Sequence, residues 1–383
     1  MPDKGFVLLT NHWLRGLSGT EVATRDFALG LAGRGWRVGV FSPNGVAFPR
    51  ELPPLVQAVN DLSLLDGEPD VIHGHHHPSL AIAMMRFPAA PAVQLCHDAK
   101  AWADEALLLE RVRRRLAVDE ACRERVVLET GLAETDVAIV PNAIDLTRFP
   151  PRGALPAWPR TALIIANRDA SHVPALEAAC AAAGIETRAI GFGVDQPSDD
   201  IGAAMAGADI VFGAARLALE AMAVGCAVVV CDARGLAGMA TAEDYAAWRR
   251  FNFGWRLLTQ TVTPESAAAA IAGYDAADAM ALSAQARLTC GLGHAIDALE
   301  AAYEQVIAEH RPGQIDPVRE AQALSAYLQR WLPISYGNSP FRFAFEELRT
   351  ELRQSQAKLD GLTAELARRG MTVTFRTEPP PES

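Results

Sequence analysis

The chain has 383 residues, of which 50% are hydrophobic and 21% are charged, and its formal net charge is −11. This length corresponds to roughly two domains of about 150 residues each, and the composition is ordinary for a soluble globular enzyme. The negative charge argues against a nucleic-acid partner, because nucleic-acid-binding surfaces usually carry a basic footprint.

The cysteines and the apolar runs indicate a cytoplasmic protein. No apolar run approaches the roughly 20 residues of a membrane span. No pair of cysteines has CxxC spacing, so we expect buried thiols in a reducing compartment. The cysteines are Cys96, Cys122, Cys180, Cys226, Cys231 and Cys290.

Residues 5–41 follow the order strand, loop, helix, strand. Residues 5–11 and 38–41 are apolar runs, and residues 21–33 have apolar positions at helical spacing. The loop between them contains Gly19, whose backbone could approach a ligand. An ordinary turn with a helix N-cap explains the same residues. The order is typical of a nucleotide-binding α/β half, although the loop lacks a GxGxxG fingerprint.

Histidines follow the next two apolar runs. In an extended strand, His73, His75 and His77 would share one face. No carboxylate or cysteine nearby completes a metal site, so we predict none. His97 comes after residues 93–96 and stands beside Asp98. An imidazole at a strand end beside a carboxylate can bind a ligand hydroxyl or stabilise charge, and a core or N-cap histidine is the alternative.

Two further segments complete the first half of the chain. Residues 107–115 are predicted to form a helix with a basic patch at residues 111–115. This patch could contact anionic lipid, or it could be a solvated face paired with nearby carboxylates. Residues 139–150 form a short apolar run followed by prolines, which is typical of a linker. We therefore place a domain boundary near residue 152.

The second half repeats the α/β order. Residues 161–166 are a predicted strand, followed by a loop that starts at Asn167 and Arg168. Residues 208–241 predict a strand, a small-residue loop from 213 to 215, a helix from 217 to 223, a strand and a loop from 235 to 238. Glu220 on this helix could hold the vicinal diol of a ribose or simply complement the helix dipole. The loop 235–238 could bind phosphate through backbone amides or be a plain turn.

Helices are expected from residue 243 to residue 310. Residues 341–368 then carry apolar side chains at a/d spacing over about three heptads. This pattern is consistent with a homodimer, with a docking helix, or with packing on the protein's own body. Residues 374–383 are proline-rich and are expected to be disordered.

Several of these segments resemble the GT-B glycosyltransferases, and specifically the large retaining family four. The resemblance is specific at PNAIDLTRFP (141–150) and LEAMAVGCAVVVCD (219–232), and moderate at DVIHGHHH (70–77) and VQLCHD (93–98). It implies an α/β fold with two Rossmann-like domains facing a cleft and a C-terminal helical extension. Residues 1–152 would form the acceptor-side domain and 153–310 the donor domain. Residues 311–333 would form a crossover helix and 334–383 a helical tail.

The resemblance also implies an activity and a set of site residues. A sugar would move from a nucleoside diphosphate donor to a glycan or lipid-linked acceptor, with retention and without a cofactor or metal, in the synthesis of cell-surface glycans. Glu220 would hold the ribose, Arg168 the diphosphate, and His97 with Asp98 the sugar end. The remaining donor-binding positions would be Asn167, Gly19, Gly213, Leu217, Gly235 and Leu236, and the acceptor-side positions His75 and Asn142. The protein would be cytoplasmic, in possible contact with the inner membrane face through residues 111–115.

The chain departs from the family pattern at three places. Phe212 stands where the family has the first of two glutamates separated by seven residues, and His172–Val173 stand where a lysine is usual. Ala143 replaces a glycine. These departures motivate a rival hypothesis, in which a catalytically reduced GT-B protein acts as a binding or assembly module through its helical tail.

Overall fold

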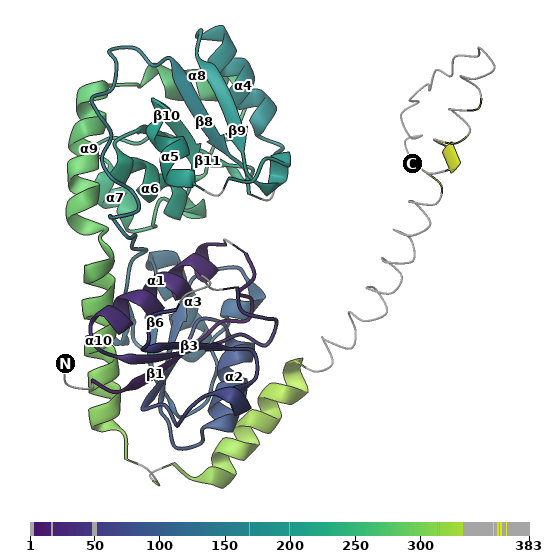
Figure 1. The fold of residues 1–383 in the computed structure, drawn as a ribbon, viewed down its shortest axis with the longest axis vertical. Coiled ribbons are helices and arrows are strands. Elements are labelled where there is room, and N and C mark those ends of the chain that lie inside the picture. Colours follow the sequence, from purple (N-terminus) through teal and green to yellow (C-terminus); the bar gives the residue numbers. More distant parts are fainter. Residues whose placement is uncertain are drawn as a thin grey trace. The chain divides into compact units, whose positions relative to one another are not determined.

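The computed structural model describes residues 4–16, 18–47, 52–167, 169–198, 200–311, 313 and 315–331, with isolated positions 355, 358, 359, 361 and 365. Residues 1–316 form one compact unit, and residues 317–383 are assigned to a second. The first unit contains two sheets, each flanked by helices (Figure 1). We call residues 4–152 the first half and residues 153–316 the second half of this unit.

The first half contains a parallel sheet of seven strands in the order β3-β2-β1-β4-β5-β6-β7. The pairing is parallel throughout, so the carboxyl ends of β1, β4 and β5 lie at one edge. The strands are β1 Phe6–Thr10, β2 Arg37–Phe41, β3 Val56–Val59, β4 Val71–Gly74, β5 Ala92–Cys96, β6 Val112–Ala117 and β7 Val137–Ile139. The helices are α1 Gly19–Gly33, α2 His77–Arg86 and α3 Glu120–Thr130, with 3-10 turns η1 Leu62–Leu64, η2 Trp102–Asp104 and η3 Glu134–Asp136.

The second half contains five strands in the order β12-β11-β10-β8-β9, of which β12 is antiparallel. The strands are β8 Thr161–Ile165, β9 Glu186–Ile190, β10 Ile210–Gly213, β11 Ala227–Asp232 and β12 Gly235–Met239. The helices are α4 Val173–Ala182, α5 Ile201–Ala206, α6 Arg216–Val224, α7 Tyr245–Arg249, α8 Pro264–Ala272, α9 Ala276–Thr289 and α10 Leu292–Glu309, with turns η4 Phe192–Val194 and η5 Trp255–Leu257. The predicted strand–helix–strand unit is β10, α6 and β11, and Gly225 ends α6 in the left-handed conformation.

Helix α10 returns to the first half. Ala295, Ile296, Leu299, Tyr303 and Val306 form its apolar stripe and are buried in the core of the first sheet. Figure 1 shows α9 beside the second sheet and α10 beside the first. The apolar face of α10 thus crosses from the second half to the first, and the prediction of a crossover helix at residues 311–333 stays a prediction. The described part of 317–331 is helical.

The predicted helix over residues 107–115 was also wrong. Residues 112–117 form β6, which pairs with β5 and β7. Arginine favours helix locally, but strand pairing in a buried sheet overrides this weak preference. Arg111 is buried and donates to the backbone oxygens of Met84, Phe87 and Ala90, while Arg114 pairs with Glu309 of α10. The basic patch at residues 111–115 is therefore not on a helix, and its contact with a membrane stays a prediction.

Two other predictions bear on location and assembly. Among the described residues, no helix is long and apolar enough to span a bilayer. All six cysteines are free and buried. The dimer predicted through residues 341–368 falls almost entirely outside the described residues and stays a prediction.

Candidate functional site

Histidines from neighbouring strands meet at the carboxyl edge of the first sheet. His75 follows β4 and His97 follows β5, and 2.6 Å separates Nδ1 of His75 from Nε2 of His97. Beneath them, Nδ1 of His73 lies 2.5 Å from the hydroxyl of Tyr303 on α10. Phe27 of α1 stacks on the rings of both His73 and His75. The structure thus joins two of the predicted site residues, His75 and His97, directly.

The histidine rings are neutral at pH 7. Burial lowers the pKa of His73 to about 3. Burial also holds the pKa values of His75 and His97 well below 6.5, and the neighbouring histidines lower them further. Two neutral imidazoles share one proton across their hydrogen bond, so one ring donates and the other accepts. The lowered pKa of His97 makes its ring a neutral hydrogen-bonding group and not a cation.

Asp104 is a buried carboxyl group at this edge that the sequence analysis did not select. Its Oδ1 accepts the backbone N–H of His97 at 2.6 Å, and its Oδ2 lies 3.9 Å from Nε2 of His76. Burial raises the pKa of Asp104 to about 7. Nothing in the local sequence separates it from an exposed loop carboxylate, because the burial arises from packing between the loops after β4 and β5.

Asp98 and Gly19 occupy loops at the same edge. The Asp98 carboxylate accepts backbone N–H groups of Lys100 at 2.7 Å and Ala101 at 3.0 Å, so it organises its own turn. Gly19 is exposed at the start of α1, and nothing lies within 4 Å of where its Cβ would stand. The preceding loop is held by Glu21, which accepts hydrogen bonds from the backbone N–H groups of Arg15, Gly16 and Ser18. This loop has room beside Gly19 for a ligand.

Glu220 lies in an ion-pair network that links the two halves. The Nε atom of Arg216 donates to Oε1 of Glu220 at 2.8 Å, and Arg216 also pairs with Asp26 of α1. A third bond of 3.0 Å runs from Nη1 of Arg216 to the backbone oxygen of Ala143 in the linker. Burial raises the pKa of Glu220, and Arg216 opposes that change. A ribose at Glu220 would have to share the carboxylate with Arg216.

Phe212 and Ala215 flank the start of α6. Phe212, which replaces the first family glutamate, is 1% exposed and packs in the core between the second sheet and helices α4 and α8. It therefore offers a ligand no polar group. Ala215 has φ 53° and ψ −125°, a conformation that side chains disfavour, and its N–H donates to the oxygen of Phe253 at 2.8 Å.

The other donor positions of the second half are only partly defined. Asn167 is exposed at the carboxyl end of β8, and Arg168 lies outside the described residues. Gly213 ends β10, and a Cβ there would lie 3.4 Å from Cβ of Leu217. Gly213 and Leu217 therefore form the tight β10–α6 turn.

Gly235 and Leu236 do not form the predicted phosphate loop. They begin β12, and the Leu236 N–H is committed to the oxygen of Gln260 at 2.8 Å. Gly235 has φ +152°, and a Cβ there would lie 2.7 Å from the oxygen of Leu258. The glycine thus permits close packing of two backbone segments, and the Leu236 amide is already engaged within the protein. The donor-binding role of Gly235 stays a prediction.

Asn142 belongs to a second set of contacts between the halves. Its backbone N–H donates to Oδ1 of Asn252 at 3.2 Å, and its oxygen accepts from Arg249 at 2.6 Å. Asn252, with φ 47°, also donates to the backbone oxygen of Val118 at the end of β6. The backbone of Asn142 therefore fixes the linker, and the acceptor-side role of this residue stays a prediction.

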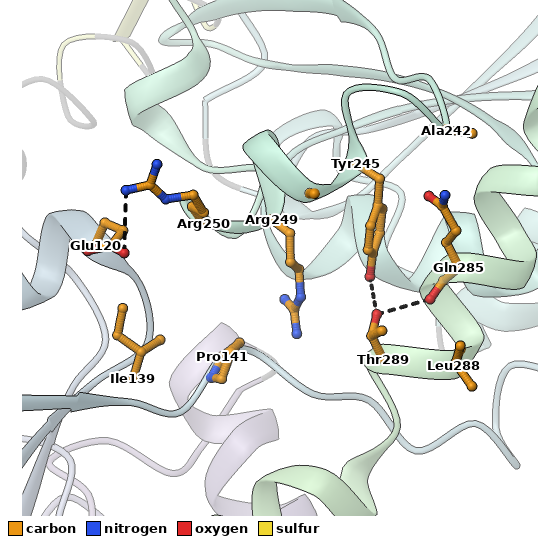
Figure 2. Close-up of a pocket in the computed structure, with 11 residues that line it drawn as sticks. Glu120, Ile139, Pro141, Ala242, Tyr245, Arg249, Arg250, Gln285, Leu288 and Thr289 are labelled. Carbon is orange, nitrogen blue, oxygen red and sulfur yellow. Dashed lines mark hydrogen bonds and ion pairs between the residues drawn. The ribbon is translucent and has the colours of Figure 1, made fainter.

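A cavity of about 550 Å³ lies beside this linker (Figure 2). Arg249 and Tyr245 of α7 line it, and Tyr245 is hydrogen-bonded to Thr289 of α9. It contains none of the predicted site residues. Among the described residues, no group of three or more histidine, cysteine, aspartate or glutamate side chains could hold a metal ion.

Comparisons with known proteins agree with this architecture. Residues 17–148 match the sequence model of Glycosyltransferase Family 4. No curated protein matches the sequence. The solved structure of a glycosyltransferase from Rickettsia africae ESF-5 is similar to this one, with 11% sequence identity and a TM-score of 0.55. The match covers 81% of this chain and 100% of the Rickettsia chain.

Two other solved structures share the fold. Sucrose-phosphate synthase from Thermosynechococcus elongatus is 13% identical, with a TM-score of 0.53, and the match covers 80% of this chain and 100% of the synthase chain. The catalytic domain of starch synthase IV from Arabidopsis thaliana, bound to ADP and acarbose, is 9% identical, with a TM-score of 0.50 over 80% and 99%. Together with the two α/β halves, these likenesses confirm the predicted architecture. The chain is therefore a GT-B-fold protein, and residues 17–148 of its first half match the family 4 model.

Proposed function

We propose that the protein transfers a sugar from a nucleoside diphosphate donor to a glycan or lipid-linked acceptor. One observation carries the proposal. The paired His75 and His97 stand at the carboxyl edge of the half that matches the family 4 sequence model, and the Arg216 network ties this half to Glu220. Open α/β sheets bind ligands at the carboxyl ends of their strands.

Each group has a role that its chemistry supports. Glu220 accepts hydrogen bonds from the ribose, Arg168 neutralises the diphosphate, and the backbone near Gly19 approaches the phosphates. His97 hydrogen-bonds the transferred sugar as a neutral imidazole. Transfer proceeds with retention, without a metal and without a protein nucleophile, in the cytoplasm. Closure of the two halves excludes water from the activated donor.

A binding or assembly module is the second candidate function. Two observations favour it. Phe212 fills the place of a polar family residue with a buried ring, and Arg216 engages the Glu220 carboxylate that would hold the ribose. In this case a nucleotide would bind weakly or not at all, and no transfer would occur.

Thermal shift with UDP, GDP, ADP and CDP and their common sugar conjugates tests the proposal. A specific ligand at 100 times its Kd stabilises the fold by about 2.7 kcal/mol. Stabilisation by one nucleotide, followed by turnover of its sugar conjugate in the presence of a chelator, is the expected result. Absence of a shift with every nucleotide would favour the assembly module.

The Glu220 variant needs care because of its ion pair. Glu220→Ala would leave Arg216 buried beside an empty site, which destabilises a protein by about 3–5 kcal/mol. Glu220→Gln keeps an acceptor for Arg216 and is therefore the informative variant. Glu177→Gln, at an exposed position of α4, is the matched control and should keep full nucleotide binding. Equal nucleotide affinity in both variants would show that the charge of Glu220 does not contribute to donor binding.

A further inference from the structure

Two exposed tryptophans lie together at the histidine edge. Trp13 follows β1 and is 41% exposed, and Trp102 begins η2 and is 48% exposed. Their ring centroids are 6.0 Å apart with the planes at 89°. Large aromatic side chains normally bury their area, and a cluster left open to solvent marks a binding surface more often than a lone exposed ring does. We call this pair the indole platform.

Three histidine rings contact the indole platform. The His12 ring is 4.3 Å from Trp13 and 5.9 Å from Trp102, centroid to centroid. The ring of His76 lies 5.6 Å from Trp13, and that of His77 lies 5.6 Å from Trp102. These contacts come from three separate loops, so the indoles are fixed before any ligand arrives. Such preorganisation reduces the entropic cost of binding.

The indole platform is linked to His97 through Asp104. Trp102 and Asp104 belong to the same short turn, and Asp104 accepts the backbone N–H of His97 at 2.6 Å. Asp104 also lies 3.9 Å from Nε2 of His76, which supports Trp13. A ligand resting on the indoles is therefore beside the strand end that carries His97.

Polar groups surround the apolar faces of the platform. Beneath the indoles, Nδ1 of His12 is buried and has no hydrogen-bond partner among the described residues. Asp98 and Lys100 stand on the loop that leads to Trp102, and the ammonium of Lys100 lies 3.8 Å from the ring centroid of Trp255 in the second half. A hydrocarbon chain would leave these groups unsatisfied. A pyranose ring presents C–H groups on its faces and hydroxyl groups at its edges, so it complements both features.

We propose that Trp13 and Trp102 form the acceptor subsite and that the acceptor unit bound there is a sugar ring. This inference rests on the proposed function and commits it to a carbohydrate acceptor rather than a lipid or peptide group. Trp13 and Trp102 bind the apolar face of the ring, and polar groups of the surrounding loops bind its hydroxyl groups.

A microbial glycan array and a nucleotide thermal shift, on the same full-length preparations, test the inference. Wild type with saturating nucleotide is expected to bind at least one array glycan. Trp13→Ala and Trp102→Ala should weaken that binding by about 10-fold or more, because each removes a stacking surface. Trp102→Phe should retain most of it. Both positions are about half exposed, so the melting temperature should change little.

Trp158→Ala is the matched control, since Trp158 is 54% exposed and lies in the second half. It should leave glycan binding unchanged. Nucleotide binding with no glycan bound by wild type, or glycan binding indifferent to Trp13 and Trp102, would overturn the inference and leave the proposed function intact. Tryptophan-dependent glycan binding without nucleotide binding would support the subsite and overturn the transferase. Loss of nucleotide binding in Trp13→Ala or Trp102→Ala would assign the platform to the donor base and also overturn the inference.

Discussion

The buried histidines should make the protein unfold in mild acid. His73, His75, His76 and His77 are each at most 4% exposed. Burial lowers the pKa of His73 and His77 to about 3 and that of His76 to about 4, and holds that of His75 well below 6.5. A histidine with a lowered pKa in the fold binds its proton only when unfolded, so its contribution to stability is lost as pH falls below 6.5.

The magnitude follows from the size of the pH step. A pH of 5 lies about 1.5 units below the pKa of an unfolded histidine, so each buried histidine lowers the unfolding free energy by about 2 kcal/mol, and four lower it by about 8 kcal/mol. Asp104 acts in the opposite direction, because its pKa of about 7 in the fold means that the folded state takes up a proton between pH 8 and pH 5 and the unfolded state does not. This proton uptake raises the unfolding free energy by about 3 kcal/mol. The net loss of about 5 kcal/mol is comparable to the whole stability of many proteins.

Urea unfolding followed by circular dichroism from pH 8 to pH 5 measures this effect. The slope of the unfolding free energy should correspond to an uptake of nearly three protons around pH 5.5. His77→Gln should reduce the slope by about one proton. His294→Gln, at an exposed position of α10, should not change it. A slope below one proton would refute the reasoning, since it would mean that the rings are already solvated or charged in the fold.

Three further predictions concern single side chains. Asp104→Asn keeps an acceptor for the His97 N–H and removes a carboxyl group whose raised pKa lowers the stability of the fold above pH 4. In the same urea experiment, the unfolding free energy of the variant relative to wild type should therefore be about 3 kcal/mol higher at pH 8 than at pH 5. An unchanged pH dependence would contradict this. Ala215→Gly should raise the unfolding free energy by about 1 kcal/mol, because relief of the φ 53° strain exceeds the entropic cost of glycine; a lower melting temperature in calorimetry would show that the conformation is unstrained. Asp26→Ala should cost about 3–5 kcal/mol by leaving Arg216 underpaired in the interior, whereas Asp26→Asn should cost less; equal losses in denaturant would show that charge is unimportant there.

Much of the fold follows from local patterns in the sequence. The β10–α6–β11 unit is readable because small and apolar residues have helical spacing, a glycine closes the helix and β-branched residues follow. The paired histidines at the ends of β4 and β5 are also accessible to sequence reasoning, since parallel strands bring their carboxyl ends to one edge. These features depend on neighbours close in the chain.

Other features were decided only by contacts between distant segments. Residues 112–117 became a strand because β5 and β7 supply hydrogen-bonding partners, despite the helix preference of arginine. The crossing was made by α10 because its apolar stripe fits the first core. The raised pKa of Asp104 and the link between Arg216 and Asp26 likewise require burial and charge pairing across loops and halves. The sequence by itself determined where β1, β5, β8, β10 and β11 end and which residue types stand there. The tertiary structure decided which of these residues are buried, because burial depends on packing between segments far apart in the chain.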